Sequence, residues 1–245
     1  GTGVAAPRRG RRDVPEMLDR IARAAAAAKT GPLAEAGERQ ALPPLPDDAS
    51  LPPGKGRQEH VARFRAELES LTGKVYGPFA PEGVAKQVLD LLAERGIAAI
   101  VAWKDDELAC PGLADALRAA GISLVGVDVP GGDGRRGALE RLAAIPAGLT
   151  GALAGLADTG SIVVASGRGR SRVASLLPPL HVAVFPVARL YPTMAAWLAD
   201  GGAALVSEAA NVVAITGPSR TADIELTIAL GVHGPREVHV VLLGA

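Results

Sequence analysis

The stretch Asn211-Val-Val-Ala-Ile-Thr216-Gly-Pro-Ser-Arg-Thr-Ala-Asp223 decides the predicted fold, together with the apolar run at 238–243. Both apolar runs, at 212–216 and 238–243, have the length and composition of buried strands. A helix between two such strands would let them pair in a compact parallel unit. The C-terminal forty residues therefore predict a strand, a helix and a second strand of one parallel sheet.

The segment between these strands carries two competing signals. From Thr221 to Ile228 polar and apolar residues alternate strictly, which is typical of a half-buried strand. We nevertheless expect a helix, because Ala, Glu and Leu favour helices and Gly231 suits a helix end. That choice places the block 216–223 at a helix N-terminus, where backbone N–H groups attract anions.

Upstream, apolar runs alternate with segments of helical periodicity. Short, buried strands that alternate with helices indicate an α/β domain with a mostly parallel sheet flanked by helices. Residues 129–137, rich in glycine, are expected to form a flexible loop. Further strands are predicted at 97–103, 122–127, 162–165 and 182–185, and helices at 81–96, 113–120 and 192–200.

The first part of the chain differs in composition from the rest. Helices are predicted at 13–29 and 58–71, and the proline-rich segment 42–57 between them is typical of a linker. The strand pattern begins only after Gly73. The sequence therefore predicts an N-terminal helical extension at 1–72 and an α/β domain at 73–245.

Composition excludes several classes of protein. The 245 residues carry a formal net charge of +0, which argues against general attraction to nucleic acid or anionic membranes. No uncharged apolar run reaches the roughly 20 residues of a membrane helix. The arginines at 8–12 are not followed by an apolar segment, so we expect no export signal and a cytoplasmic location.

Cofactor chemistry is also constrained. One cysteine, Cys110, cannot supply an all-cysteine iron–sulfur site within one chain. No His, Cys, Asp or Glu spacing predicts a metal site, and no flavin or nicotinamide fingerprint is present. We expect no cofactor in this chain.

Two polar loops are expected to meet, because parallel sheets bind ligands beyond the carboxyl ends of their strands. The block 216–223 and the basic loop 166–172 each follow a predicted strand, and could form one site for a small organic acid or phosphate. Their alternatives are a capped helix and a solvated loop, and His233 could equally be a turn residue. The candidate anion- or substrate-binding residues are Thr159, Gly160, Ser161, Arg172, Thr216, Gly217, Ser219, Arg220, Thr221, Asp223 and His233; no catalytic residue is assigned.

Four strings of sequence resemble a known family. Residues 216–225, TGPSRTADIE, and 230–235, LGVHGP, resemble the signature of the LUD domain family, and more closely its lactate-utilization protein C group. Residues 157–162, ADTGSI, are similar to the AETGT segment of that family, and 176–181, LLPPLH, to its LLPxxH segment. Asp158 stands where the family has glutamate.

The resemblance implies a NagB/RpiA/CoA-transferase-like fold and a role in oxidising L-lactate to pyruvate beside iron–sulfur partner subunits. Periodicity and spacing alone do not indicate lactate. Two alternatives stay open: a free-standing enzyme acting on a phosphorylated or CoA-linked organic acid, and a non-catalytic assembly or regulatory protein.

Overall fold

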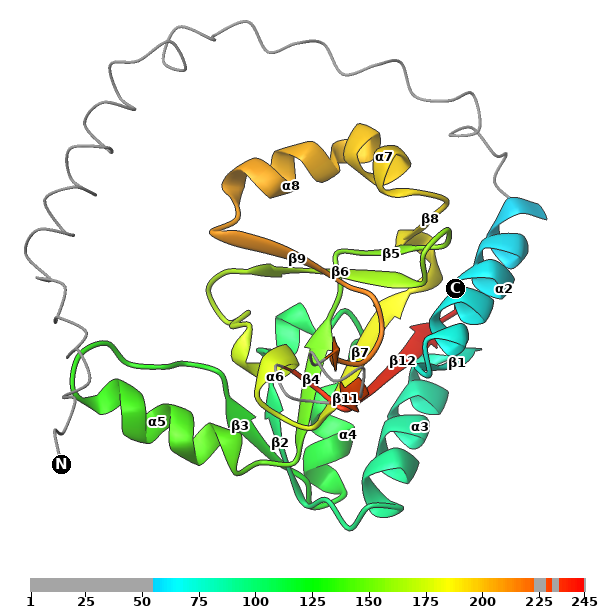
Figure 1. Cartoon of the computed structure of the whole chain (residues 1–245). Helices are drawn as coiled ribbons and strands as arrows, with labels where there is room; N and C mark the ends of the chain where they lie inside the picture. Colours follow the sequence, from blue (N-terminus) through cyan, green and yellow to red (C-terminus); the bar gives the residue numbers. More distant parts are fainter. Residues whose placement is uncertain (1–54, 223–227, 231–233, 245) are drawn as a thin grey trace, which may run out of the picture. The chain divides into compact units, whose positions relative to one another are not determined.

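The computed structural model describes residues 55–222, 228–230 and 234–244, which form a layered α/β domain (Figure 1). The helix predicted at 13–29 lies outside these residues. So do most of the predicted linker and the candidate residues Asp223 and His233.

A six-stranded parallel sheet forms the centre of the domain. Its spatial order is β1-β12-β7-β4-β2-β3, so the first strand along the chain pairs with the last. The central strand β7 is buried over most of its length, as expected for a parallel sheet covered on both faces. The strands are β1 (Lys74–Phe79), β2 (Ala99–Ala102), β3 (Ser123–Gly126), β4 (Ala147–Gly151), β7 (Leu180–Pro186) and β12 (Glu237–Leu243).

A second sheet has four strands, in the order β8-β5-β6-β9. In it β6 pairs antiparallel with both β5 and β9. A separate antiparallel pair follows, made of β10 and β11. The bounds are β5 (Ala154–Leu156), β6 (Ser161–Ser166), β8 (Leu190–Tyr191), β9 (Asn211–Ile215), β10 (Arg220–Ala222) and β11 (Ile228–Leu230).

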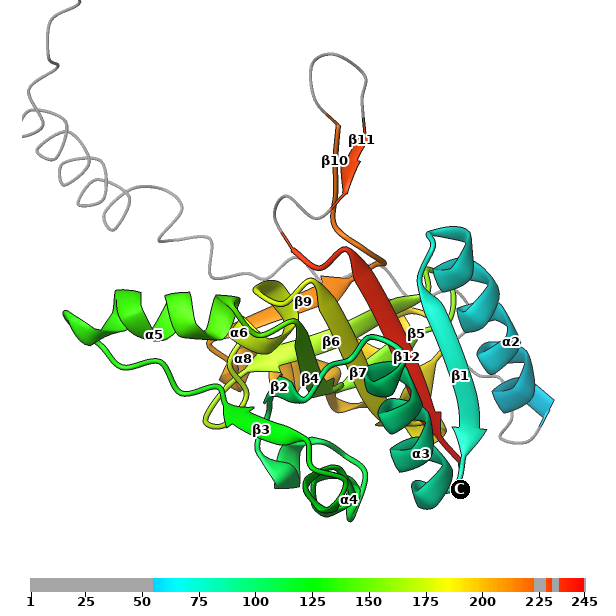
Figure 2. The ribbon, with the colours of Figure 1, turned by 90° about the horizontal axis from the view of Figure 1, so that it is seen from below.

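Helices cover both sheets and complete four layers. On one face of the parallel sheet, α3 contacts β1 and β12 and α4 contacts β3, with apolar side chains of both helices in one buried cluster. The opposite face meets α2, α6 and the second sheet, and α7 covers the outer side of that sheet (Figures 1 and 2). The helices are α2 (Lys55–Ser70), α3 (Pro81–Ala93), α4 (Leu113–Ala119), α5 (Gly134–Ala143), α6 (Val173–Leu176), α7 (Met194–Trp197) and α8 (Ala203–Glu208).

The predicted α/β class with a mostly parallel central sheet is confirmed, but the helix predicted after Thr221 is wrong. Residues 220–222 and 228–230 form an antiparallel pair, with Thr221 opposite Ala229. At its described ends, 221–222 and 228, the alternation was therefore a strand signal, and residues 223–227 lie outside the described residues. Helix propensity misled because it is weak compared with pairing between strands.

Two predicted strands lie in a different sheet from the one expected. The strands at 162–165 and 212–216 are β6 and β9, which pair with each other antiparallel in the second sheet. Consequently β9 and β12 do not form the parallel unit that we expected.

The predicted loop at 129–137 also ends earlier, because Gly134 begins α5.

Helix α2 packs closely on the α/β domain, although the predicted boundary assigned it to the extension. Phe64 and Leu68 are fully buried, in one cluster with Val240 and Leu242 of β12. The ring of Phe64 meets Phe185 edge-on, with centroids 6.0 Å apart. This packing argues for a boundary before Lys55, and the division at 72/73 stays a prediction.

Candidate functional site

The two polar loops predicted to converge lie at opposite ends of the same strand pair. Strands β6 and β9 run antiparallel, with Ile162 opposite Ile215 and Ser166 opposite Asn211. Thr216 therefore follows one end of the pair, and the loop holding Arg172 follows the other. At about 3.4 Å per residue the two ends are roughly 14 Å apart. The expectation of one site joining both loops is wrong.

Three hydroxyl groups form a chain at the first end. Ser161 Oγ lies 2.8 Å from Thr159 Oγ1 and 2.7 Å from Thr216 Oγ1. Ser161 is buried, whereas Thr159 and Thr216 are exposed. The structure therefore does bring together three of the candidate residues, from the turn before β6 and the end of β9.

Three more candidate residues hold the C-terminal end of α2. Arg220 Nη2 donates to the carbonyl of Leu71 at 2.6 Å and lies 3.2 Å from Thr72 Oγ1. A cation at a helix C-terminus satisfies carbonyls that lack partners within the helix. Gly160 and Gly217 let the chain approach α2 closely, so these family-like residues serve packing in this structure.

The remaining candidate residues of this block lie further along the chain. The backbone N–H of Ser219 donates to Pro235 O at 2.8 Å, which ties the block to the segment before β12. Thr221 belongs to the β10–β11 pair. Asp223 and His233 lie outside the described residues, so their proposed roles stay predictions.

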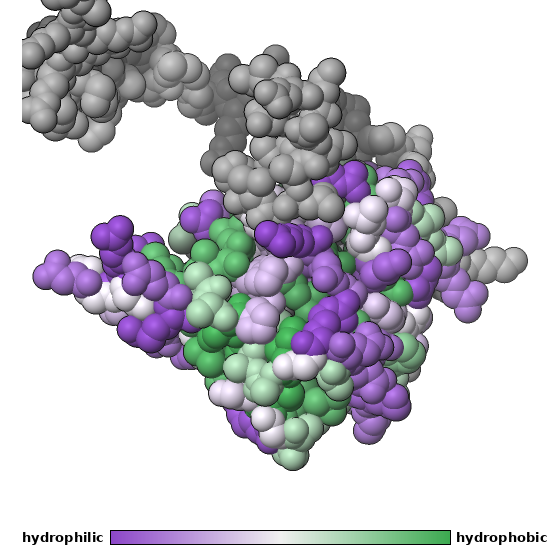
Figure 3. Space-filling model, turned by 60° about the horizontal axis from the view of Figure 1, so that its bottom comes forward, coloured by the Kyte–Doolittle hydropathy of each residue, from purple (hydrophilic) through white to green (hydrophobic). Residues whose placement is uncertain are grey.

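At the second end a cavity of about 420 Å³ contains Arg172, and we call it the arginine groove. Its cationic and polar lining comes from Arg135 of α5 and from Ser166, Arg170, Ser171 and Arg172. Figure 3 shows hydrophobic surface beside the hydrophilic projection of α5. Arg135 was absent from the predicted site, because no pattern in the sequence indicates that α5 returns to this loop.

The loop of the arginine groove is fixed to the carboxyl end of β2. Trp103 Nε1 donates to Ser171 O at 3.0 Å, and the N–H of Lys104 donates to Gly169 O at 3.1 Å. The groove thus lies where open parallel sheets bind their ligands. The prediction derived this position from the strand at 162–165, which instead lies in the second sheet, so the binding role of Arg172 stays a prediction.

Exposed Arg172 keeps hydrogen-bond donors that an anion in the arginine groove can use, whereas Arg170 Nε and Ser166 Oγ are buried. Arg172 Nη1 contacts Asn211 Oδ1 at 3.4 Å, which uses one of five guanidinium N–H donors. Arg170 lies 3.5 Å from Glu107, while its buried Nε and the buried Ser166 Oγ have no protein partner among the described residues. Such an array can bind carboxylate or phosphate through charge-assisted hydrogen bonds.

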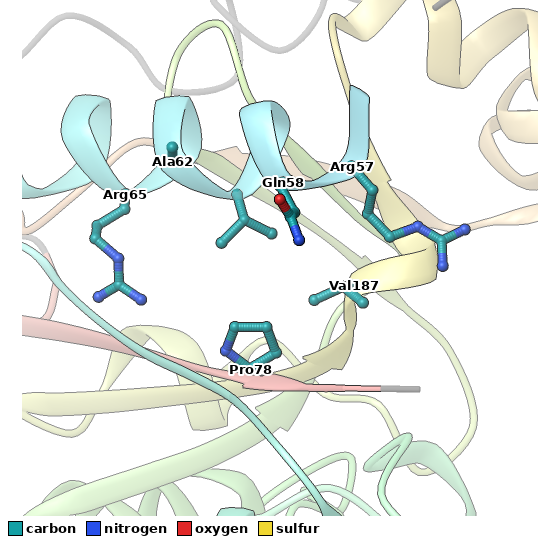
Figure 4. Close-up of a pocket in the computed structure, with 7 residues that line it drawn as sticks. Arg57, Gln58, Ala62, Arg65, Pro78 and Val187 are labelled. Carbon is teal, nitrogen blue, oxygen red and sulfur yellow. The ribbon is translucent and has the colours of Figure 1, made fainter. Parts of the chain in front are cut away.

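A second cavity, of about 590 Å³, lies between α2 and the end of β1. Figure 4 shows Arg57 and Arg65 at opposite ends, with Pro78 and Val187 facing the helix between them. Arg65 donates to the carbonyls of Val75 and Gly77, so its guanidinium holds α2 on β1. This cavity therefore offers a ligand fewer unused guanidinium donors than the arginine groove does.

Two buried histidines lie in the central sheet. His181 of β7 is fully buried with Nε2 2.9 Å from Thr150 Oγ1, and burial lowers its pKa from 6.5 to about 4. On β12, His239 donates to Glu237 at 3.1 Å and accepts from the Tyr76 hydroxyl at 3.1 Å. Burial also lowers the pKa of His239, although hydrogen bonding to Glu237 opposes that shift. Both are neutral core residues.

Across residues 55–222 and the described segments after them, no group of three or more His, Cys, Asp or Glu could hold a metal ion. Within those segments, no helix has both the length and the apolar character needed to span a membrane.

Fold and site together define a layered α/β domain with an arginine-lined groove. Residues 61–243 match the family model of the LUD domain, and the chain belongs to the LUD domain family. The crystal structure of a DUF162 family protein from Deinococcus radiodurans has a similar fold, with a TM-score of 0.55 at 19% sequence identity. That similarity covers 77% of this chain and 98% of the other.

Sequence relatives cover shorter parts of the chain. A protein of Neisseria meningitidis is 40% identical over 101 residues, which cover 40% of this chain and 42% of that protein. Lactate utilization protein C of Exiguobacterium is 41% identical over 99 residues, 39% of this chain and 43% of its own. The protein of that name from Macrococcus caseolyticus is 29% identical over 162 residues, 63% of this chain and 65% of its own. The alignments to the first two relatives span less than half of those proteins.

Proposed function

We propose that this chain acts in lactate utilization, as a subunit that supports oxidation of L-lactate to pyruvate by iron–sulfur partner chains. The observation that carries the proposal is membership of the LUD domain family, joined with relatives named lactate utilization protein C. On this proposal the electron-carrying centres belong to the partners, and this chain contributes binding surfaces in the cytoplasm.

The arginine groove is compatible with this role. Lactate, pyruvate and acidic protein segments all present carboxylates, which guanidinium groups bind with two parallel hydrogen bonds. Arg135 and Arg172 are both exposed at this groove, so an anion can reach them from solvent.

Growth on L-lactate tests the proposal. A deletion strain should fail to grow when L-lactate is the sole carbon source and grow normally on pyruvate, because only the oxidation step is lost. Expression of the full chain should restore growth. Equal growth of deletion and parent strains on both carbon sources would refute the lactate role.

One alternative has a structural observation in its favour. The arginine groove, with three arginines and two serines, could also bind the phosphate of a phosphorylated or CoA-linked acid. That function predicts turnover by the purified chain alone. Assaying the isolated protein with and without partner chains separates the two functions, since a subunit is active only in the complex.

A further inference from the structure

The arginine groove has an apolar wall that a small acid does not require. The apolar lining comes from Leu139 of α5, Val173 and Leu176 of α6, and Leu177. Leu176 and Leu177 are 40% and 37% exposed, among the most exposed large hydrophobic side chains of the described chain. Apolar side chains exposed together beside polar ones occur at protein-interaction sites and at ligand-binding grooves, so the charge and size of the groove must distinguish the two.

The charged side chains around this apolar wall are mostly positive. Arg135, Arg170 and Arg172 line the cavity. Glu107 offsets part of the charge of Arg170, at 3.5 Å. The groove thus combines exposed leucines with cations that keep unused hydrogen-bond donors.

The groove continues along α5. A neighbouring cavity of about 560 Å³ shares Arg135 and Leu139 with it and adds Arg136, Asp133 and Glu140. Arg136 pairs with Glu140 at 3.5 Å, but both are highly exposed and such pairs are weak. Together the two cavities, of about 420 and 560 Å³, suit an extended or helical segment better than a three-carbon acid.

We propose that the arginine groove docks an acidic segment of a partner protein that also carries an apolar residue. An apolar side chain of that segment packs on Leu176 and Leu177, and its carboxylates bind Arg135 and Arg172. The inference rests on the proposed function, because the partner expected on that basis is an iron–sulfur chain of the lactate-oxidising system. It adds which surface of this chain the partner contacts.

Site-specific photo-crosslinking in the native host tests the contact. A photoreactive amino acid at position 177 of the full chain should crosslink an iron–sulfur protein through a segment rich in Asp, Glu and apolar residues. Position 205 is the matched control, because Leu205 is 41% exposed on α8 and residues 198–208 contain no lysine or arginine. Equal crosslinking at both positions, no crosslink at 177, or a crosslinked segment without acidic residues would overturn the proposal.

Binding of the crosslinked partner, once purified, provides a quantitative test. Arg172→Glu should weaken affinity about ten- to a hundred-fold, since a charge-assisted hydrogen bond is lost. Arg168→Glu is the control: its side chain is exposed in the same loop but does not line the groove, so affinity should change by less than about threefold. Equal effects of the two substitutions would contradict docking in the groove.

Titration with L-lactate and inorganic phosphate separates docking from small-ligand binding. If either anion binds the wild type, loses affinity in Arg172→Glu and keeps it in Leu177→Gln, the groove is a small-ligand site and docking is overturned. If docking fails while growth on L-lactate still requires the chain, the proposed function stands without this surface. Normal growth of the deletion strain would instead refute the proposed function.

Discussion

At the scale of single residues, Gly160 allows the family-like segment before β6 to approach the backbone of α2 closely. Gly160 has φ +64°, and a Cβ atom there would lie 2.4 Å from the backbone nitrogen of Leu68. No side chain fits without moving the helix. The residue we first considered for a binding role is therefore required by a backbone contact.

Gly160→Ala should destabilise the fold by several kcal/mol, with Gly96→Ala as the matched control. Gly96 has φ +62°, but a Cβ atom added there would have no neighbour within 4 Å, so it reports the backbone strain alone, about 1–2 kcal/mol. Overpacking at Gly160 should add about 1–3 kcal/mol. Urea unfolding measures both variants, and equal losses would show that α2 moves aside freely.

His181 should make the domain less stable in acid. Its pKa in the folded state is about 4, below the ordinary 6.5, because burial disfavours the charged imidazolium. Between these pH values the unfolded chain binds more protons, so stability is complete above about pH 6.5 and falls as pH decreases toward 4. The shift corresponds to a loss of about 3 kcal/mol at most.

The variant His181→Gln isolates this effect, since glutamine can still bond Thr150 but does not titrate. Unfolding free energies of both proteins should be measured at several pH values between 4 and 7. The wild type should lose about 3 kcal/mol more than the variant. Contributions from His239 occur in both proteins and cancel, so parallel pH profiles would contradict the assignment.

At the scale of elements, α2 is a part of the core rather than an appendage. A chain that begins at Gly73 loses Phe64 and Leu68, whose burial stabilises the fold by about 1.5–3 kcal/mol each. That loss, about 3–6 kcal/mol in sum, is a large part of the stability of a typical domain, about 5–15 kcal/mol. The division predicted at 72/73 overlooked these contacts because helical spacing does not reveal which surface a helix covers.

Truncation tests the role of α2. A chain starting at Lys55 should melt cooperatively, whereas one starting at Gly73 should be insoluble or melt without cooperativity. Circular dichroism during heating measures both. Matching cooperative transitions would show that the domain folds without α2 and would support the boundary at 72/73.

The local sequence pattern predicted where strands occur better than it predicted which sheet each strand joins. The runs at 97–103, 122–127 and 238–243 are strands of the parallel sheet, as expected from their apolar composition. The runs at 162–165 and 212–216 have similar composition but lie in the second sheet, because pairing depends on contacts distant in sequence. For the same reason the hydroxyl chain and the contribution of Arg135 to the groove could not be predicted.

The candidate site was predicted in part. Thr159, Ser161 and Thr216 do meet, and Arg172 does line a cavity near the carboxyl end of β2. Arg220 was expected to bind an anion because an arginine beside hydroxyls resembles an anion cradle. Its use at the end of α2 depends on a helix nearly 150 residues earlier in the chain, as its contact with Leu71 shows.

At the scale of the whole molecule, the isolated chain should carry no redox centre. Its single cysteine cannot hold an iron–sulfur cluster alone, and the sequence has no flavin or nicotinamide fingerprint. Protein purified without oxygen should show only aromatic absorption in its ultraviolet–visible spectrum. A stoichiometric flavin or iron–sulfur band would contradict this prediction, whereas the same band in a co-purified complex belongs to the partner.

The position of β12 has a consequence for biosynthesis. This strand, at 237–243, lies between β1 and β7, so the earliest strand of the sheet has no neighbour until the last one has been translated. Domains generally fold as units, and exposed strand edges make incomplete chains prone to aggregation. A chain that ends shortly before residue 237 therefore lacks the strand that joins β1 to β7. Such chains, and nascent chains of that length, should depend on chaperones.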